Sequence, residues 1–462
     1  MNSDFENILI KIPEIGKNMH ELMTELFPIC RSITGNGVRQ SLKIIQNHIS
    51  LNVSEIPSGT EVFDWTIPRE WNINDAYIKN SKGEKIVDFK NSNLHVLNYS
   101  IPINTKLSLQ ELLPHLHSLP EQPNVIPYRT SYYKENWGFC ISHNQLINLQ
   151  DDEYEVVIDS TLENGSLTCA EFFIRGESED EVLFSCYTCH PSMCNDNLSG
   201  VVLCTFLAKY LQNLKLKYSY RFLFVPETIG TITWLSQNES SVKKIKHGLV
   251  AYCVGDPGNS SYKKSRKGNA EIDQVVVEVL KNSGDEYNVV DFFPTGSDER
   301  QFCSPGFNLP MGALVRTFAP DFSQYHTSAD NTEFVKAEYL ADTLSKYVKV
   351  ISKLEDNFGK FKSNDNEEFN KIVSKKNDRI FLNLNPKCEP QLGKRKLYHD
   401  VGSQIPSQGG QKILNQFALL WVLNYSDGFH YLSDIAKLSG YDLIDIENAA
   451  NALLESNLLK EL

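Results

Sequence analysis

The sequence has no surplus of basic residues: 45 lysines and arginines stand against 58 aspartates and glutamates, a formal net charge of -13. A protein that mainly binds nucleic acid or an anionic membrane needs a cationic surface, so a small neutral or cationic ligand fits this balance better. No run approaches the roughly 18 apolar residues of a membrane span, and residues 1–7 lack the features of a signal peptide. We therefore expect a cytoplasmic protein with no membrane segment.

Disulfide bonds are not expected either, although the sequence contains ten cysteines. Several lie in apolar runs, where a reduced thiol packs as a small hydrophobic side chain; Cys186, Cys204 and Cys253 are examples. Residues 186–190 also fit the Cys-x-x-Cys-His pattern of covalent haem attachment. We reject that interpretation, because such haem belongs to exported proteins and because residues three apart on a strand point to opposite faces.

The pattern of apolar residues changes several times along the 462 residues and indicates more than one domain. Residues 1–52 have the spacing of two helices, and residues 150–360 alternate between strand and helix patterns, so we assign both to one α/β domain. Residues 53–149 have the pattern of a β-rich insertion. After a polar linker, residues 380–462 have the short helices of a winged helix. We therefore predict a mixed sheet flanked by helices, a small β-rich inserted domain and a C-terminal winged-helix domain.

Histidines and carboxylates follow successive strand-like runs of the α/β region. His190 and Asp196 come first, Glu227 follows the next apolar run, and Asp256 and His326 follow later ones. In open α/β sheets, ligands gather at the carboxyl ends of the strands. Histidine and carboxylate side chains are also the usual ligands and bases of hydrolytic metal sites. The order therefore predicts a metal centre with a carboxylate base beside it.

Each of these residues also has a purely structural interpretation. His190 could be a hydrogen-bonded structural histidine, Asp196 a helix N-cap, and Asp256 part of an ordinary Asp-Pro-Gly turn. Glu227 is harder to explain in this way, since a carboxylate buried after an apolar strand is costly unless it is paired or coordinated.

A polar loop at residues 296–302 separates two predicted strands. In one interpretation it is a turn followed by a short helix that Asp298 or Ser297 caps. In the other it faces the substrate, and Arg300 pairs with a carboxylate of that substrate. Arg300 and Glu299 of this loop are therefore candidate substrate contacts. Tyr325, next to His326 in the sequence, is a further candidate.

Several blocks in order resemble the zinc-dependent aminopeptidase superfamily, which includes bacterial secreted aminopeptidases and glutamate carboxypeptidases. The blocks are residues 63–71, 189–200, 226–230, 296–302 and 325–330, and they extend over most of the chain. The resemblance is in particular to a bacterial branch of uncharacterised aminopeptidase-like proteins linked to surface-polysaccharide biosynthesis. That branch carries a small β-rich insertion and a C-terminal winged helix, in agreement with the organisation above.

The resemblance implies a role for each candidate residue. It makes His190 a ligand of a first metal, Asp196 the ligand that bridges two metals, and His326 a ligand of the other metal. It makes Asp256 a further carboxylate ligand and Glu227 the general base.

The sequence departs from the superfamily pattern at two positions. Thr228 stands where a second glutamate, a zinc ligand, is usual. A threonine hydroxyl cannot replace a carboxylate there, so we expect one Zn²⁺ rather than two, held by His190, Asp196 and His326. Glu299 stands where a histidine commonly follows Gly-Ser-Asp, so the substrate specificity of the superfamily does not carry over.

The last fifty residues contain two lysines and seven carboxylates. Such a surface repels phosphate, which makes nucleic acid an unfavourable partner. We expect this domain to pack within the protein, to bind a protein partner or to form a homo-oligomer.

These observations together predict a zinc-dependent hydrolase, an aminopeptidase or related amidase that acts on the terminus of a peptide or of an aminoacylated sugar. Glu227 would be the base for metal-activated water. Two alternatives stay open at this stage. One is a catalytically reduced binding or regulatory protein that keeps the peptidase fold and its metal site, and the other is a transcription factor with a hydrolase-like sensor.

Overall fold

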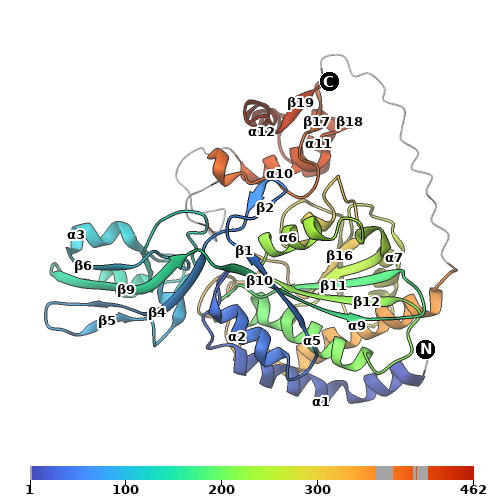
Figure 1. Ribbon diagram of the computed structural model, residues 1–462, viewed down its shortest axis with the longest axis horizontal. Coiled ribbons are helices and arrows are strands. Elements are labelled where there is room, and N and C mark those ends of the chain that lie inside the picture. Colours follow the sequence, from blue (N-terminus) through green and yellow to red (C-terminus); the bar gives the residue numbers. More distant parts are fainter. Residues whose placement is uncertain (1–2, 361–377, 399–401, 403–414) are drawn as a thin grey trace.

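The computed structural model of the protein describes residues 3–360, 378–398, 402 and 415–462. Its largest domain is built on an eight-stranded sheet in the order β1-β10-β12-β11-β13-β16-β14-β15 (Figure 1). The strands are β1 (Asn52–Pro57), β10 (Ser166–Ile174), β11 (Glu181–Tyr187), β12 (Ser219–Val225), β13 (Ile245–Val250), β14 (Ser260–Lys263), β15 (Tyr287–Val290) and β16 (Met311–Val315). The neighbours β12, β11, β13 and β16 are parallel. Their carboxyl ends therefore meet at one edge, where the following loops can bring side chains together.

The central strands are continuous apolar runs because both faces of the sheet are covered. One face packs into a single hydrophobic core with α1 (Ser3–Leu26), α2 (Asn36–Ile45), α5 (Ser199–Leu211), α7 (Glu271–Lys281) and α9 (Ala337–Asn357). The other face packs with α6 (Ile229–Gln237), α8 (Glu299–Phe302) and the insertion. Figure 1 shows α1, α5 and α9 below the sheet and α6 above it. The predicted mixed sheet flanked by helices is confirmed.

The last helix of this domain shows how its sequence determines its placement. Apolar residues recur at helical spacing along α9 and just before it, and these residues form a buried stripe: Val335, Leu340, Leu344, Val348 and Ile351. The stripe faces α1 and the sheet, which holds the start and the end of the domain together.

The insertion contains a separate antiparallel sheet in the order β5-β4-β9-β6. Its strands are β4 (Glu70–Lys79), β5 (Lys85–Asp88), β6 (Ile103–Ser108) and β9 (Glu153–Glu163). We expected the strand pattern at residues 155–160 to belong with the α/β domain, and this placement was wrong. The alternating burial along β9 matches the small sheet, which has one packed face, and not the fully covered large one.

Shorter elements complete the insertion and its borders. They are the pairs β2 (Glu61–Val62) with β3 (Trp65–Thr66) and β7 (Leu116–His117) with β8 (Phe139–Cys140), and the helices α3 (Leu109–Leu112) and α4 (His143–Ile147). Arg39 of α2 forms ion pairs with Glu55 of β1 and Glu70 of β4, so a single guanidinium joins the two sheets to α2.

In its described residues, the C-terminal domain contains three α-helices and a small sheet in the order β18-β17-β19. Its elements are β17 (Ile380–Asn383), α10 (Gln416–Tyr425), β18 (Asp427–Tyr431), α11 (Leu432–Ser439), α12 (Leu443–Glu455) and β19 (Leu459–Glu461). The segment after β17 runs along the α/β domain. There Cys388 and Glu389 donate their backbone N–H groups to Ser304 and Gln301. The domain limits themselves stay a prediction.

Two further expectations concern cysteines and membranes. All ten cysteines are free thiols, and nine of them are buried, including Cys186, Cys204 and Cys253 as predicted. Among the described residues, no helix has both the length and the apolar character that crossing a bilayer requires.

Candidate metal centre

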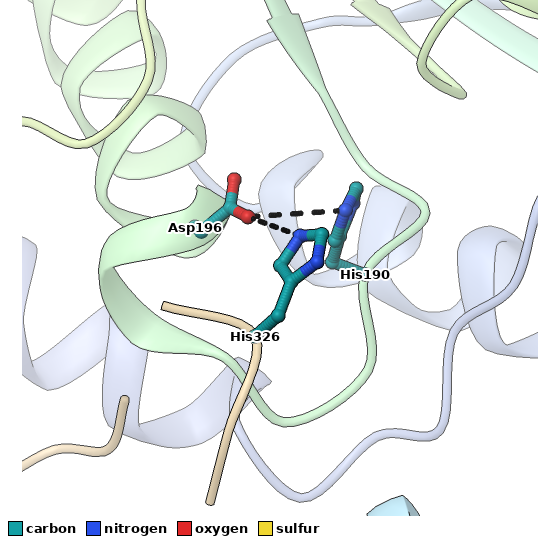
Figure 2. Close-up of side chains that lie close together, drawn as sticks. All are labelled: His190, Asp196 and His326. Carbon is teal, nitrogen blue, oxygen red and sulfur yellow. Dashed lines mark ion pairs between the residues drawn. The ribbon is translucent and has the colours of Figure 1, made fainter. Parts of the chain in front are cut away.

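Three of the predicted ligands come together at the carboxyl edge of the large sheet. His190 lies in the loop after β11, Asp196 in the irregular turn η3 (Cys194–Leu198) before α5, and His326 in the loop between β16 and α9. One ligand atom from each lies within 4.8 Å of the others. Nε2 of His326 is 2.9 Å and Nε2 of His190 is 3.9 Å from Oδ2 of Asp196 (Figure 2). All three side chains are buried.

The bonding of these side chains fits a metal ion. Nδ1 of His326 is buried without a hydrogen bond to any described residue, and its Nε2 meets only Asp196. Burial lowers the pKa of His190 to about 4, which keeps its imidazole neutral and able to donate a lone pair. Although burial opposes ionisation of Asp196, the two histidines and the Tyr187 hydroxyl lower its pKa to about 2. Two imidazoles and a carboxylate are a set of protein ligands found at catalytic zinc.

Neighbouring groups fix the orientation of Asp196. The hydroxyl of Tyr187 donates to its Oδ1. The carboxylate of Asp330 accepts the backbone N–H groups of Asn195, at 2.6 Å, and of Asp196, at 2.9 Å. Burial raises the pKa of Asp330 to about 7, although these backbone hydrogen bonds oppose the shift. The turn that presents Asp196 is thus held from two sides.

Asp256, which we expected as a further ligand, does not join the group. Its Oδ2 accepts from the side chain of Asn195 at 3.0 Å and from the backbone N–H of Thr317 at 3.2 Å. Its Oδ1 accepts from the Thr317 hydroxyl at 2.6 Å and from the backbone of Gly258 at 2.8 Å. Both oxygens are therefore occupied, and the residue supports the turn that carries Asp196.

Glu227 lies beside the three ligands, at the end of β12. Its Oε2 is 3.8 Å from Nε2 of His190, and its side chain is 26% exposed, more than any of the three. Restricted contact with water raises the pKa of Glu227 well above its usual range, and the carboxylates of Asp298 and Asp196 add to the effect. A carboxylate with a raised pKa at the open side of the group can hold a proton during a reaction.

Thr228 has a left-handed backbone, with φ 63°, which is costly for a β-branched residue. Its N–H donates to Asp298 at 2.7 Å, and its hydroxyl accepts from Nη2 of Arg300 at 3.1 Å. Thr228, which follows Glu227, is therefore bonded to the loop at residues 296–302, and its hydroxyl faces a guanidinium.

The candidate substrate contacts are engaged within the protein. Nε of Arg300 donates to Glu389 at 2.8 Å, and its Nη1 donates to the backbone of Gly296 at 2.6 Å. Glu299 forms a completely buried ion pair with Lys263. The ring of Tyr325 stacks on His326 with 3.8 Å between centroids. Their contact with a substrate stays a prediction.

Sequence reasoning missed three residues near the centre. Tyr187 ends the strand that leads to His190, and Asp330 closes the block that contains His326, so both lay within recognised motifs. Tyr128 comes from the insertion, and its ring lies 5.2 Å from the rings of both His190 and His326. Nothing in the local sequence around Tyr128 signals this contact.

Residues 20–357 match a family model described as a domain of unknown function, DUF4910. The chain belongs to this DUF4910 family. Residues 379–461 of this DUF4910 protein match a second model, described as a winged helix-turn-helix, which confirms the predicted C-terminal winged helix.

Individual relatives agree with this assignment. A Clostridium acetobutylicum protein, provisionally named a polysaccharide biosynthesis protein with an aminopeptidase-like domain, is 55% identical over 447 residues, 97% of each chain. The crystal structure of a provisionally named peptidase from the same organism is 53% identical, with 100% of each chain covered and a TM-score of 0.76.

A more distant structure identifies the fold. The zinc aminopeptidase BSAP from Bacillus subtilis is 12% identical to this DUF4910 protein and has a TM-score of 0.53, over 73% of this chain and 94% of the other. Identity this low shows the fold alone. The predicted aminopeptidase-like fold is confirmed.

Proposed function

We propose that this DUF4910 protein is a metal-dependent hydrolase of terminal amide bonds that works with one Zn²⁺. The observation that carries the proposal is the group of His190, Asp196 and His326, whose ligand atoms lie within 4.8 Å of one another, with the carboxylate of Glu227 at its open side. Zinc held by this group would supply Lewis acidity, which activates water and polarises a carbonyl.

The residues of the chain divide the remaining work. Glu227 takes a proton from the attacking water at a carboxylate oxygen and returns it to the leaving nitrogen. Its raised pKa suits the second step, because a protonated carboxyl must be stable long enough to serve as an acid. Tyr187 and Asp330 hold Asp196 in place while the charge at the site changes.

A single zinc is favoured over two by the surroundings of Thr228. Its hydroxyl accepts from Nη2 of Arg300, and its backbone N–H already occupies an oxygen of Asp298. Among the described residues, the only group of three or more potential ligands is the one already named. A second cation would lack a carboxylate ligand and would face a guanidinium.

The substrate class follows from two supporting points. The superfamily fold is shared with a zinc aminopeptidase, and the Clostridium relative is named for polysaccharide biosynthesis with an aminopeptidase-like domain. We infer that the substrate is a small peptide or an aminoacylated sugar with a free amino terminus. We also propose that the C-terminal domain binds either a protein partner or a second copy of this chain.

A second candidate function is a binding or regulatory protein that retains the metal site. The observation that favours it is the burial of all three ligands together with the internal pairing of Arg300 and Glu299. Such a protein would bind a defined ligand and zinc but would turn over no amide.

The decisive experiment combines metal analysis with activity. We expect about one zinc per chain in the purified protein, and hydrolysis of at least one member of a panel of aminoacyl amides and aminoacylated amino sugars. Glu227→Gln should keep zinc and lose at least about 100-fold in rate, whereas the exposed control Glu61→Gln should match the wild type. Zinc binding without turnover of any panel member would favour the second candidate, and absence of zinc would contradict both.

A further inference from the structure

A large groove lies between the insertion and the N-terminal part of the α/β domain. Its volume is about 850 Å³, and its walls come from residues 27–40 before and within α2, from the start of β4 at residues 71–74, and from the loop at residues 89–94. None of His190, Asp196, Glu227 and His326 lines it. Ser192 and Ser328, each two residues from one of these histidines, do line it, so the groove borders the loops that carry the ligands without containing the ligands themselves.

The walls of the groove are polar but almost uncharged. Six asparagines and one glutamine line it, together with four threonine or serine residues. Lys90 is its only charged residue, and its ammonium is 3.3 Å from the carboxylate of Asp75. A phosphate-bearing ligand needs several unpaired cations, so nucleic acids and sugar nucleotides fit this lining poorly.

Several of the amides are free to bind a ligand. Within the described part of the chain, the side chains of Gln40, Asn74 and Asn91 make no hydrogen bond, and all three are exposed. The buried Asn93 donates to the backbone of Pro28 at 3.3 Å, but its Oδ1 has no partner. An unpaired buried carbonyl is costly, and a ligand or a water molecule held by a ligand would satisfy it.

Other amides form a rigid frame. Oδ1 of Asn72 accepts the backbone N–H of Asn36 at 2.7 Å, and Oδ1 of Asn36 accepts from Arg39 at 3.1 Å. Since Arg39 is also paired with Glu70, this wall of the groove is fixed before any ligand arrives. A preformed wall lowers the ordering cost of binding.

Apolar surface accompanies the free amides. Phe27 and Phe89 are half-buried and line the groove beside exposed asparagines. A carboxamide both donates and accepts hydrogen bonds, as a sugar hydroxyl does, and an aromatic ring can pack against the C–H face of a pyranose. We propose that this groove binds a neutral oligosaccharide.

The groove is also connected to the metal centre by packing. Leu94 lines the groove and forms a small apolar cluster with Tyr128 and Met193. The Tyr128 ring contacts both histidines of the metal centre. An oligosaccharide held here would lie beside the centre without contacting the ligands. Binding itself depends on the groove alone and not on the proposed hydrolysis.

The test is calorimetric titration of the full-length protein with maltotetraose, cellotetraose and N,N′,N″,N‴-tetraacetylchitotetraose, and with an uncharged Gly-Ser tetrapeptide of blocked ends. We expect saturable binding of at least one sugar and none of the peptide. Asn74→Ala and Asn91→Ala should each weaken it about fivefold, the loss of one hydrogen bond. Asn164→Ala, which changes an exposed asparagine between β9 and β10 outside the groove, should bind as the wild type does.

Three results would overturn the proposal: no binding of any of the sugars, binding that is unchanged in both groove variants, or binding of the peptide in place of a sugar. Two further measurements separate this proposal from the proposed enzyme function. Glu227→Gln and zinc-stripped protein should bind the sugar with unchanged affinity, so failure of hydrolysis leaves the groove test intact and failure of binding leaves the hydrolysis test intact.

Discussion

Arg300 and Glu389 form an ion pair, 2.8 Å from Nε to Oε2, that joins the loop beside Glu227 to the segment after β17 in the C-terminal domain. Both side chains are largely buried, and Arg300 also reaches Thr228. Through these contacts of Arg300, the C-terminal domain is linked to Thr228 at the edge of the metal centre. The backbone of Glu389 strengthens the junction, since its carbonyl accepts from the indole of Trp65 at 2.8 Å.

Glu389→Gln should destabilise the protein, because it leaves the buried guanidinium of Arg300 without a counter-charge. We expect a loss of about 1–3 kcal/mol in the free energy of unfolding, measured by urea denaturation. The matched control is Glu239→Gln, which removes an exposed ion pair with Lys387, two residues from Glu389. That control should change stability by less than about 1 kcal/mol. Equal effects of the two variants would contradict the structural role of the buried pair.

Acid should weaken the junction between the insertion and α2. Nη1 and Nη2 of Arg39 donate to the two carboxylate oxygens of Glu70, at 2.6 and 2.7 Å. These hydrogen bonds are the main reason that the pKa of Glu70 falls from 4.5 to about 2. Since the folded-state pKa is below the unfolded one, this stabilisation is complete above about pH 4.5 and is lost as the pH falls towards 2.

The contribution of Glu70 should be on the order of 2 kcal/mol. It is measured as the difference in unfolding free energy between wild type and Glu70→Gln at pH values from 6 down to about 2.5. The difference should shrink as the pH falls. Glu163→Gln, an exposed carboxylate opposite Glu70 on β9, serves as the control and should give a small, constant difference. A Glu70 difference that stays constant with pH would contradict the assignment.

Metal affinity should depend on Asp330, although it is not a ligand. Asn in its place has one acceptor oxygen for the two backbone N–H groups that Asp330 now accepts, so the turn carrying Asp196 should loosen. We expect Asp330→Asn to weaken zinc binding about 10- to 100-fold, as measured by competition with a chelator. Asp321→Asn, an exposed carboxylate of the same loop, should leave affinity unchanged. Unaltered affinity in Asp330→Asn would mean that the turn is held by other contacts.

The sequence allowed prediction of the parts of the site that lie at strand ends. His190, Asp196, Glu227 and His326 follow parallel strands, and the topology alone brings such residues to one edge. Asp256 fits the same rule, yet hydrogen bonds to Thr317 and Asn195 use its oxygens, and a sequence does not show such competition between partners.

Contacts between domains could not be predicted in this way. Tyr128 reaches the centre from the insertion, and Glu389 reaches Arg300 from the segment after β17, 89 residues away along the chain. The strand β9 was assigned to the wrong sheet for a related reason, because a strand pattern records which faces are buried but not which neighbour buries them.

The last prediction concerns the missing second glutamate. Restoring it by Thr228→Glu should not by itself create a second zinc site, because Arg300 already donates to this position and would pair with the new carboxylate. We expect about one zinc per chain in Thr228→Glu and a rise towards about two in Thr228→Glu combined with Arg300→Ala, measured by elemental analysis after dialysis against zinc. Arg300→Ala alone should stay at about one and serves as the control for the loss of the guanidinium. Two zincs in the single variant Thr228→Glu would show that the threonine, and not the neighbouring positive charge, limits the metal count.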